Sequence, residues 1–268
     1  MNITGNSQKY FSEVKDISKR KEILQLFEEW SKVISGCEDI LFKDDGKYYP
    51  ATDYFVKDGF YPGYFSGKYP RVLFIGRENR YISSYSKDND RILHDLEYSF
   101  ENNPDKDIFW RRVFYMFYAI ITGGKIPYSK VPYPSEMIAD KLYGFALMNI
   151  SKYSNDCDDG ANADYSLINR FLDDTNLSKR NFIREELRIL DPDIIITANL
   201  WESKIKKEYL ELVFPDKDFK FVKSYKNVAN LYDFKFENKK IKLIDTYHFS
   251  AIGSDASLFY DPVSNLIV

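Results

Sequence analysis

The sequence predicts an α/β protein organised as a three-layer sandwich, with helices on both faces of a central, mostly parallel sheet of about four strands. Two observations predict this class. Short apolar runs have the length and composition of strands buried on both faces, and each run is reached through a helical or crossover segment, as parallel neighbours require. The expected strands cover residues 72–75, 145–150, 194–198 and 241–246.

The N-terminal quarter of the chain predicts one helix followed by irregular structure. Apolar residues recur at helical spacing over residues 21–34, and Gly36 follows as a stop signal. Residues 48–70 are rich in aromatic residues and glycine, which indicates a loop with several turns. We therefore expect a single domain, residues 1–268, in which a helical and loop extension, residues 1–68, packs on a core formed by residues 69–268.

Two helices are expected between the first and second strands. Residues 107–124 indicate a mostly buried helix that is closed by Gly123 and Gly124. Residues 134–144 indicate a shorter helix with Ser135 as its N-cap. This second helix leads directly into the second apolar strand.

The C-terminal half continues the alternation of helices and strands. Residues 178–192 predict a strong amphipathic helix that is capped by Ser178 and ended by Pro192, immediately before the third strand. Residues 201–214 read as another helix. Two further strand candidates, residues 218–225 and 230–237, precede the fourth strand, which lies in the stretch 240–248.

Composition bounds the partners and cofactors. The net charge of −3 argues against a strongly basic nucleic-acid wrapper but allows a local basic patch. Cys37 and Cys157 are the only cysteines, which are too few for an iron–sulfur cluster or a four-cysteine metal site, so no cofactor is expected. No apolar run approaches the roughly 20 residues of a membrane-spanning helix. We expect a soluble, cytoplasmic protein without a membrane partner.

The residues that follow the apolar runs predict the location of a functional site. In open parallel sheets, ligands bind beyond the carboxyl ends of the strands. Gly76, Glu78, Asn149 and His248 all come at or just after the end of an expected strand. The sequence therefore predicts that these four residues lie on one rim of the sheet.

Four segments of the chain contain these strand ends: VLFIGRENR, FALMNISK, FIREELRILDPDIIITAN and IDTYHFSA. Their order along the chain resembles that of the motifs of the uracil-DNA glycosylase superfamily. In that superfamily a Gly-x-Asp/Asn-Pro type motif follows the first strand, and an asparagine follows the second. The third segment is a helix followed by a proline and an apolar strand, and the last is a His-Pro-Ser loop. Here Asn79 and Phe249 replace two of the prolines, and Glu78 occupies the catalytic position. The segments that carry the resemblance lie between residues 69 and 252.

The resemblance implies a uracil-DNA-glycosylase-like fold and hydrolysis of the N-glycosidic bond of uracil or another damaged base in DNA. Glu78 would supply a carboxylate and orient the water, and His248 would donate to the base oxygen. Asn149 would match the O4 and N3–H edge of uracil. The other substrate-binding candidates are backbone, base-stacking and phosphate-contacting residues: Gly76, Arg77, Asn79, Tyr81, Tyr85, Lys152 and Ser250.

Each candidate residue also has a structural interpretation. An asparagine or histidine at a strand end often caps a loop through backbone hydrogen bonds. Glu78 can pair with Arg77 or Arg80 on a solvated loop, and Tyr81 or Tyr85 can pack like most of the 22 tyrosines. The alternative function is therefore a catalytically inactive or repurposed superfamily member that binds a nucleotide, a nucleic acid or a protein.

Overall fold

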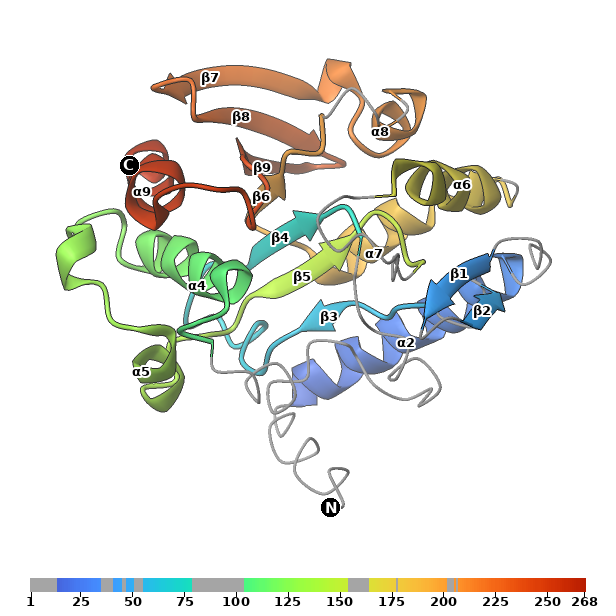
Figure 1. Cartoon of the computed structure of the whole chain (residues 1–268), viewed down its shortest axis with the longest axis horizontal. Helices are drawn as coiled ribbons and strands as arrows, with labels where there is room; N and C mark the ends of the chain where they lie inside the picture. The colour runs from blue at the N-terminus through green and yellow to red at the C-terminus, as the bar shows by residue number, and fades with distance from the viewer. Residues whose placement is uncertain are drawn as a thin grey trace.

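The computed structural model describes residues 14–34, 41–44, 47–50, 55–78, 104–153, 164–176, 178–201, 205 and 207–268. Within these residues, seven strands form one sheet, and helices cover both of its faces (Figure 1). The predicted α/β class is confirmed. The sheet is larger than the expected four strands because antiparallel strands extend it at both edges.

The four predicted strands form the parallel centre of the sheet, in the order β5-β4-β6-β9. The side chains of Val72 to Ile75 and of residues 194–198 are all buried, which is why these strands read as continuous apolar runs. The complete order is β3-β5-β4-β6-β9-β8-β7. The strands are β3 (Gly59–Phe60), β4 (Val72–Gly76), β5 (Ala146–Asn149), β6 (Ile194–Ala198), β7 (Phe219–Tyr225), β8 (Ala229–Phe236) and β9 (Lys239–Thr246).

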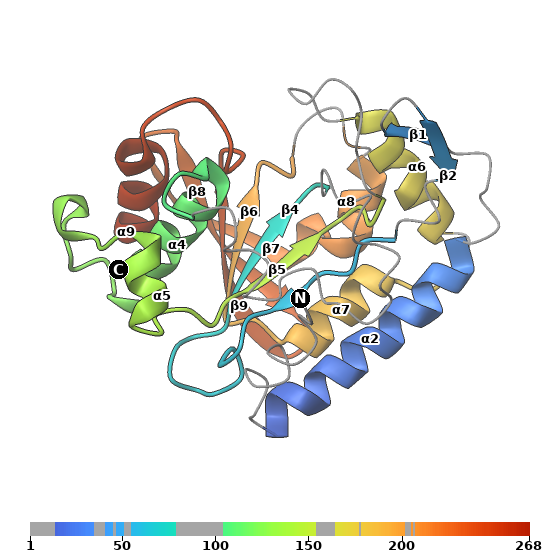
Figure 2. The ribbon, with the colours of Figure 1, turned by 60° about the horizontal axis from the view of Figure 1, so that its bottom comes forward.

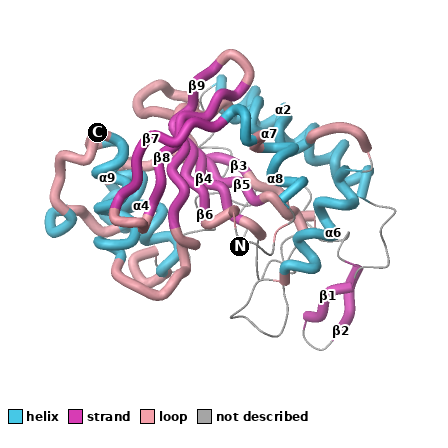
Figure 3. Tube along the Cα trace, turned by 90° about the horizontal axis from the view of Figure 1, so that it is seen from above, coloured by secondary structure: helices cyan, strands magenta, loops and turns pink. Residues whose placement is uncertain are grey.

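Helices on the two faces enclose two hydrophobic cores (Figures 2 and 3). One face carries α2 (Val14–Ile34), α6 (Tyr165–Asn176), α7 (Phe182–Leu190) and α8 (Lys207–Val213). The other carries α4 (Ile108–Ile121), α5 (Pro134–Ala139) and α9 (Asp261–Ile267). Shorter helical turns cover Tyr128–Lys130, Asp216–Asp218 and Ala256–Tyr260. In the described part of the chain, no helix is both long and apolar enough to cross a membrane.

The N-terminal segment contributes to the sheet as well as to the helical layer. The ring of Trp30 in α2 stacks on Phe182 at 5.3 Å, and its indole nitrogen donates to Thr175 Oγ1 at 2.9 Å. The region expected to be a loop contains β3, which pairs antiparallel with β5. It also contains most of β2 (Lys47–Pro50), which forms a hairpin with β1 (Leu41–Asp44). Residues 1–68 therefore supply an edge strand and part of one core.

Two predicted helix caps are wrong. Ser135 lies inside the first turn of α5, whose N-cap is Tyr133. The N-cap of α7 is Asn181, whose side-chain oxygen accepts from the backbone N–H of Arg184 at 3.0 Å. The Ser178 hydroxyl lies in the preceding turn, where it donates to a backbone oxygen at 3.0 Å. Both serines satisfy the usual cap preference, but neighbouring residues occupy the cap positions.

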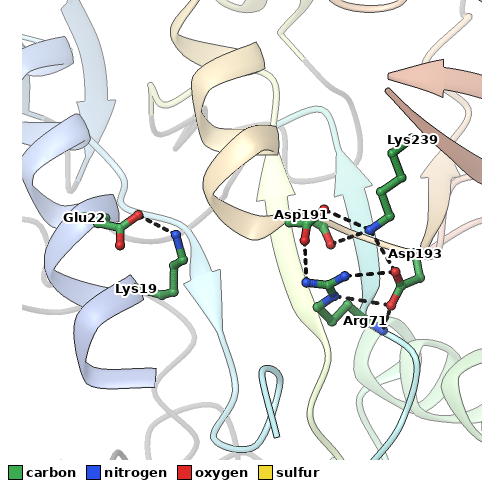
Figure 4. A network of polar contacts seen from close by, with 6 residues as sticks. All are labelled: Lys19, Glu22, Arg71, Asp191, Asp193 and Lys239. Carbon is green, nitrogen blue, oxygen red and sulfur yellow. Dashed lines mark hydrogen bonds and ion pairs between the residues drawn. The ribbon is translucent and has the colours of Figure 1, made fainter. Parts of the chain in front are cut away.

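A charged cluster joins the amino ends of three neighbouring parallel strands (Figure 4). Arg71 Nη1 lies 2.5 Å from Asp191 Oδ2, and its Nη2 lies 3.1 Å from Asp193 Oδ1. Lys239 Nζ lies 2.9 and 2.8 Å from carboxylate oxygens of the same two aspartates. Partial burial alone would raise the pKa of Asp193, but hydrogen bonds from Arg71 and Lys239 lower it to about 2. The cluster links these strands at the end opposite the candidate site.

Candidate functional site

The parallel strands bring the predicted site residues to the same carboxyl end of the sheet. Gly76 and Asn149 are direct partners in the register of β4 and β5. His248 lies two residues beyond the end of β9. Strand β6 separates β4 from β9, so the chains at these ends lie about 10 Å apart, which is two strand spacings. Gly76, Asn149 and His248 therefore share one rim, as the sequence predicts.

Gly76 is required by the close approach of Asn149. A Cβ atom at position 76 would overlap Asn149 Oδ1, so the amide oxygen lies directly against the glycine backbone. The backbone pairing continues past the strand ends, because the N–H of Ile150 donates to Gly76 O at 3.1 Å. The N–H of Ser151 likewise donates to Arg77 O at 2.9 Å. The absence of a side chain at Gly76 thus gives the Asn149 amide its place on the rim.

Asp58 holds Asn149 from the other side. Its carboxylate is fully buried and accepts the backbone N–H of Asn149 at 2.5 Å and the side-chain amide at 3.4 Å. Asp58 precedes β3, in the region that the sequence presents as an irregular loop. Asp58 is not among the site residues predicted from the sequence. The available signal was a single acid in the short stretch FVKDGF, which has apolar residues at both ends.

The Lys152 side chain is buried in the protein, so it cannot contact a phosphate at the surface. Its ammonium group is fully buried, pairs with Asp58, and lies 2.8 Å from Glu186 Oε2. The rings of Phe27 and Trp30 flank it, each with its centroid 5.3 Å from Nζ. The prediction that Lys152 contacts phosphate is therefore wrong. The residue instead neutralises the carboxylate that holds Asn149.

Glu186, on α7, completes this buried charged cluster. Neither of its carboxyl oxygens has a hydrogen-bond partner among the described residues, although Lys152 is close. Burial raises the pKa of Glu186 to about 8 against the opposing effect of the ammonium charge. Burial alone would lower the pKa of Lys152, but Asp58 and Glu186 together raise it. Burial therefore favours the protonated form of Glu186, while the two acidic side chains favour the charged form of Lys152.

The raised pKa of Glu186 predicts a pH dependence of folding stability. An unfolded glutamate loses its proton near pH 4.5, whereas the folded protein retains it to about pH 8. The free energy of unfolding should therefore fall between these values, by at most about 1.4 kcal/mol per pH unit from this group. Glu186→Gln should remove that slope. Chemical unfolding at pH 5, 6, 7 and 8 measures it, and equal slopes for the two proteins would contradict the assignment.

The segment after β4 is described only as far as Glu78. Arg77 is half-buried and turns toward α6, where its Nη1 donates to the Tyr165 hydroxyl and its guanidinium carbon lies 5.3 Å from the ring centroid. Its Nε atom has no hydrogen-bond partner among the described residues. Glu78 is partly exposed at the rim. The remaining candidates of this segment lie outside the described residues: Asn79, Tyr81 and Tyr85.

The loop after β9 holds His248 by contacts of its own. The backbone N–H of Ser250 donates to His248 Nδ1 at 3.3 Å, and the N–H of Ala251 donates to His248 O at 2.8 Å. The side chain of Ser250 is exposed. Phe249 is fully buried between Phe74 and Phe109, at centroid distances of 5.7 and 5.6 Å. A buried aromatic ring thus anchors this loop.

A second carboxyl group lies at the same end of the sheet and was not predicted. Asp245, the penultimate residue of β9, accepts a hydrogen bond from Thr197 Oγ1 at 2.6 Å. Burial raises the pKa of Asp245 to about 6, although the Thr197 hydrogen bond acts in the opposite direction. The sequence signal was an acid within the apolar run KLIDT. The rim therefore carries a partly buried acid beside the predicted residues.

The rim can supply proton donors, acceptors and carboxylates to an organic ligand. No cluster of three or more histidine, cysteine, aspartate or glutamate side chains suited to a metal ion occurs within the described ranges. Comparison with models of known protein families finds no match, and no curated protein sequence is significantly similar to the chain. The functional assignment therefore depends on the geometry of this site and on the sequence motifs.

Proposed function

We propose that the protein is a divergent uracil-DNA-glycosylase-like hydrolase that cleaves the N-glycosidic bond of uracil or another damaged base in DNA. The observation that carries this proposal is the placement of Glu78, Asn149 and His248 at one end of parallel strands. They follow the strands in the order that the resemblance to the superfamily implies. The site would combine an acid, an amide and an imidazole around one base.

The residues have complementary roles in this reaction. As the bond from the sugar to the base breaks, positive charge develops on the sugar and negative charge on the leaving base. The Glu78 carboxylate stabilises the sugar and orients the water whose oxygen bonds to C1′. His248 stabilises the base oxygen by a hydrogen bond, and Asn149 binds the O4 and N3–H edge. As the bond between C1′ and the base nitrogen breaks, the water oxygen becomes the hydroxyl on C1′ of the abasic site. The other proton of the water ends on the released base, so no proton is gained or lost overall.

The hydrogen bond at His248 Nδ1 supports a donor role for the other ring nitrogen. Because Nδ1 accepts from the N–H of Ser250, the neutral imidazole carries its proton on Nε2. A neutral Nε2–H group is suited to stabilise a base oxygen as it becomes negative. The tautomer is assigned from the hydrogen bond that Nδ1 accepts from Ser250.

Asn149→Asp tests base recognition. The substitution replaces the amide donor by an acceptor and places a second carboxyl group beside Asp58. Uracil release should fall about 10- to 100-fold, because a mismatched buried polar group costs about 1–3 kcal/mol. The assay is strand cleavage at abasic sites after incubation with uracil-containing single- or double-stranded DNA. Asn238→Asp is the matched control, since Asn238 is exposed in the turn between β8 and β9, at the opposite end of the sheet.

Full activity of Asn149→Asp would return Asn149 to a structural, loop-capping role. A loss of activity together with a large loss of thermal stability would also indicate a structural role for Asn149. The activity loss supports recognition only if the variant stays folded at the assay temperature. Thermal unfolding of Asn149→Asp and Asn238→Asp supplies that comparison.

The second candidate function is a non-catalytic member that binds a nucleotide, nucleic acid or protein. Two observations favour it: the Asn149 amide is partly engaged by Asp58, and Lys152 is buried away from any phosphate. This candidate predicts binding of uracil-containing DNA without base release. Affinity for a nucleic acid would fall steeply with added salt, because phosphate contacts release counterions. Fluorescence anisotropy at two salt concentrations, run beside the abasic-site assay, separates the two functions.

A further inference from the structure

Arg112, on α4, is a buried arginine whose hydrogen bonds converge on the loop after β9. Its side chain is 3% exposed. Nη1 donates to the backbone oxygens of Phe249 at 2.7 Å and Ala251 at 2.6 Å, and Nη2 donates to Gly253 O at 2.8 Å. Nε donates to Asp255 Oδ1 at 2.8 Å. One side chain from a distant helix therefore binds four residues of a single loop.

The guanidinium group is suited to this loop in shape and in charge. Its planar fork presents five N–H donors, and four of them are used here on three carbonyls and one carboxylate. The ring of Phe259 lies 4.2 Å from the guanidinium carbon and covers it. Buried carbonyls outside helices and sheets need donors, and Arg112 provides them. The loop conformation therefore depends on Arg112.

The residues that Arg112 binds are the ones that hold His248. Phe249 and Ala251 flank Ser250, whose N–H donates to His248 Nδ1. Ala251 also donates its N–H to His248 O at 2.8 Å. A shift of this loop would move the Ser250 N–H away from the imidazole. The position and the tautomer of the His248 ring are thus coupled to the Arg112 side chain.

We propose that Arg112 is a positioning residue, which fixes the loop of residues 249–253 and so holds the His248 imidazole in its Nε2–H tautomer. The proposal takes its functional meaning from the proposed glycosylase activity, but its structural part is independent of that activity. Arg112 and Phe249 together would supply the rigidity that a His-Pro-Ser loop obtains from its proline. Lysine cannot replace Arg112, because a single ammonium on a flexible stem cannot span the four acceptors.

The imidazole of His248 is the direct readout. The chain has two histidines, so a His94→Gln background leaves His248 as the only imidazole in a nitrogen-15 NMR spectrum. At a pH where the ring is neutral, this parent protein should show one Nε2–H tautomer. Arg112→Lys should show a mixture of the two neutral tautomers. Arg111→Lys is the matched control, because Arg111 shares Asp255 but donates to Asp105 O instead of to the loop carbonyls.

Kinetics supply the second readout. If base release is detected, Arg112→Lys should lower kcat about 100-fold with little change in KM, as expected when a reacting group is displaced by about 1 Å. An unchanged imidazole spectrum in folded Arg112→Lys would overturn the proposal. If Arg112→Lys does not fold, Asp255→Asn decides in the same way, because it removes the carboxylate that holds Nε and leaves the three loop carbonyls in place; Arg111→Lys controls for the Arg111 contact that is lost with it. An inactive parent protein would refute the proposed function and leave the spectroscopic test valid.

Discussion

Glu78→Gln should lower the rate of uracil release about 100- to 10,000-fold while the protein stays folded. The amide has nearly the same shape as the carboxylate but lacks the negative charge that stabilises the sugar cation and the basicity that orients the water. Single-turnover kinetics with uracil-containing DNA measure the effect on the chemical step. DNA affinity should change little, because the ground state has less charge on the sugar than the transition state.

Glu22→Gln is the matched control for Glu78→Gln. Glu22 is exposed on α2, where its carboxylate lies 2.6 Å from Lys19 Nζ in the same helix (Figure 4). The same chemical change there should leave base release unaltered. A fully active Glu78→Gln protein would remove Glu78 from the mechanism. A loss of thermal stability in place of activity would support the ion-pair interpretation of Glu78.

Lys152→Met should lower the free energy of unfolding by about 3–5 kcal/mol. The substitution keeps an unbranched side chain of similar length but removes the buried charge that neutralises Asp58. Breaking a buried pair on one side has a cost of this size because the other charge stays buried. Urea unfolding at pH 7 measures the loss. Lys130→Met, at an exposed position, should stay within about 0.5 kcal/mol of the parent protein.

A double substitution distinguishes loss of the ion pair from loss of packing. Asp58→Asn combined with Lys152→Met removes both charges, while the asparagine oxygen can still accept the Asn149 backbone N–H. The double variant should recover part of the stability that Lys152→Met loses, since replacing both members of a buried pair is often close to neutral. A Lys152→Met protein that loses less than 1 kcal/mol would contradict the role of Lys152 as counter-charge.

The centre of the fold could be predicted from the sequence because a strand that is buried on both faces has apolar residues at consecutive positions. The parallel strands β4, β5 and β6 coincide with such runs, whereas in β9 buried apolar residues alternate with exposed lysines. Strand β3 could not be found in this way, since it has two residues and lies in an aromatic, glycine-rich segment. Its pairing with β5 depends on contacts between residues almost 90 positions apart. Local periodicity carries no information on such pairing.

The candidate site was predictable in position but not in its charged contacts. Asn149 and His248 could be placed because the carboxyl ends of parallel strands share one rim. Lys152 follows a strand end and was therefore expected at the surface, but the Val56 N–H donates to Lys152 O at 2.7 Å and brings the N-terminal segment over it. Asp58 and Glu186 meet Lys152 only in the folded protein. Whether a charge is exposed or paired depends on these long-range contacts.

The most direct test of the proposed hydrolysis measures free uracil and abasic sites in the same reaction. The parent protein is incubated with uracil-containing single-stranded DNA, and both products are quantified. Hydrolysis should give equal amounts of the two products, in a time-dependent reaction that Glu78→Gln and Asn149→Asp both suppress. Thymine-containing DNA of the same sequence serves as the substrate control. Binding of the uracil strand without either product would contradict the proposed hydrolysis and would support the non-catalytic alternative.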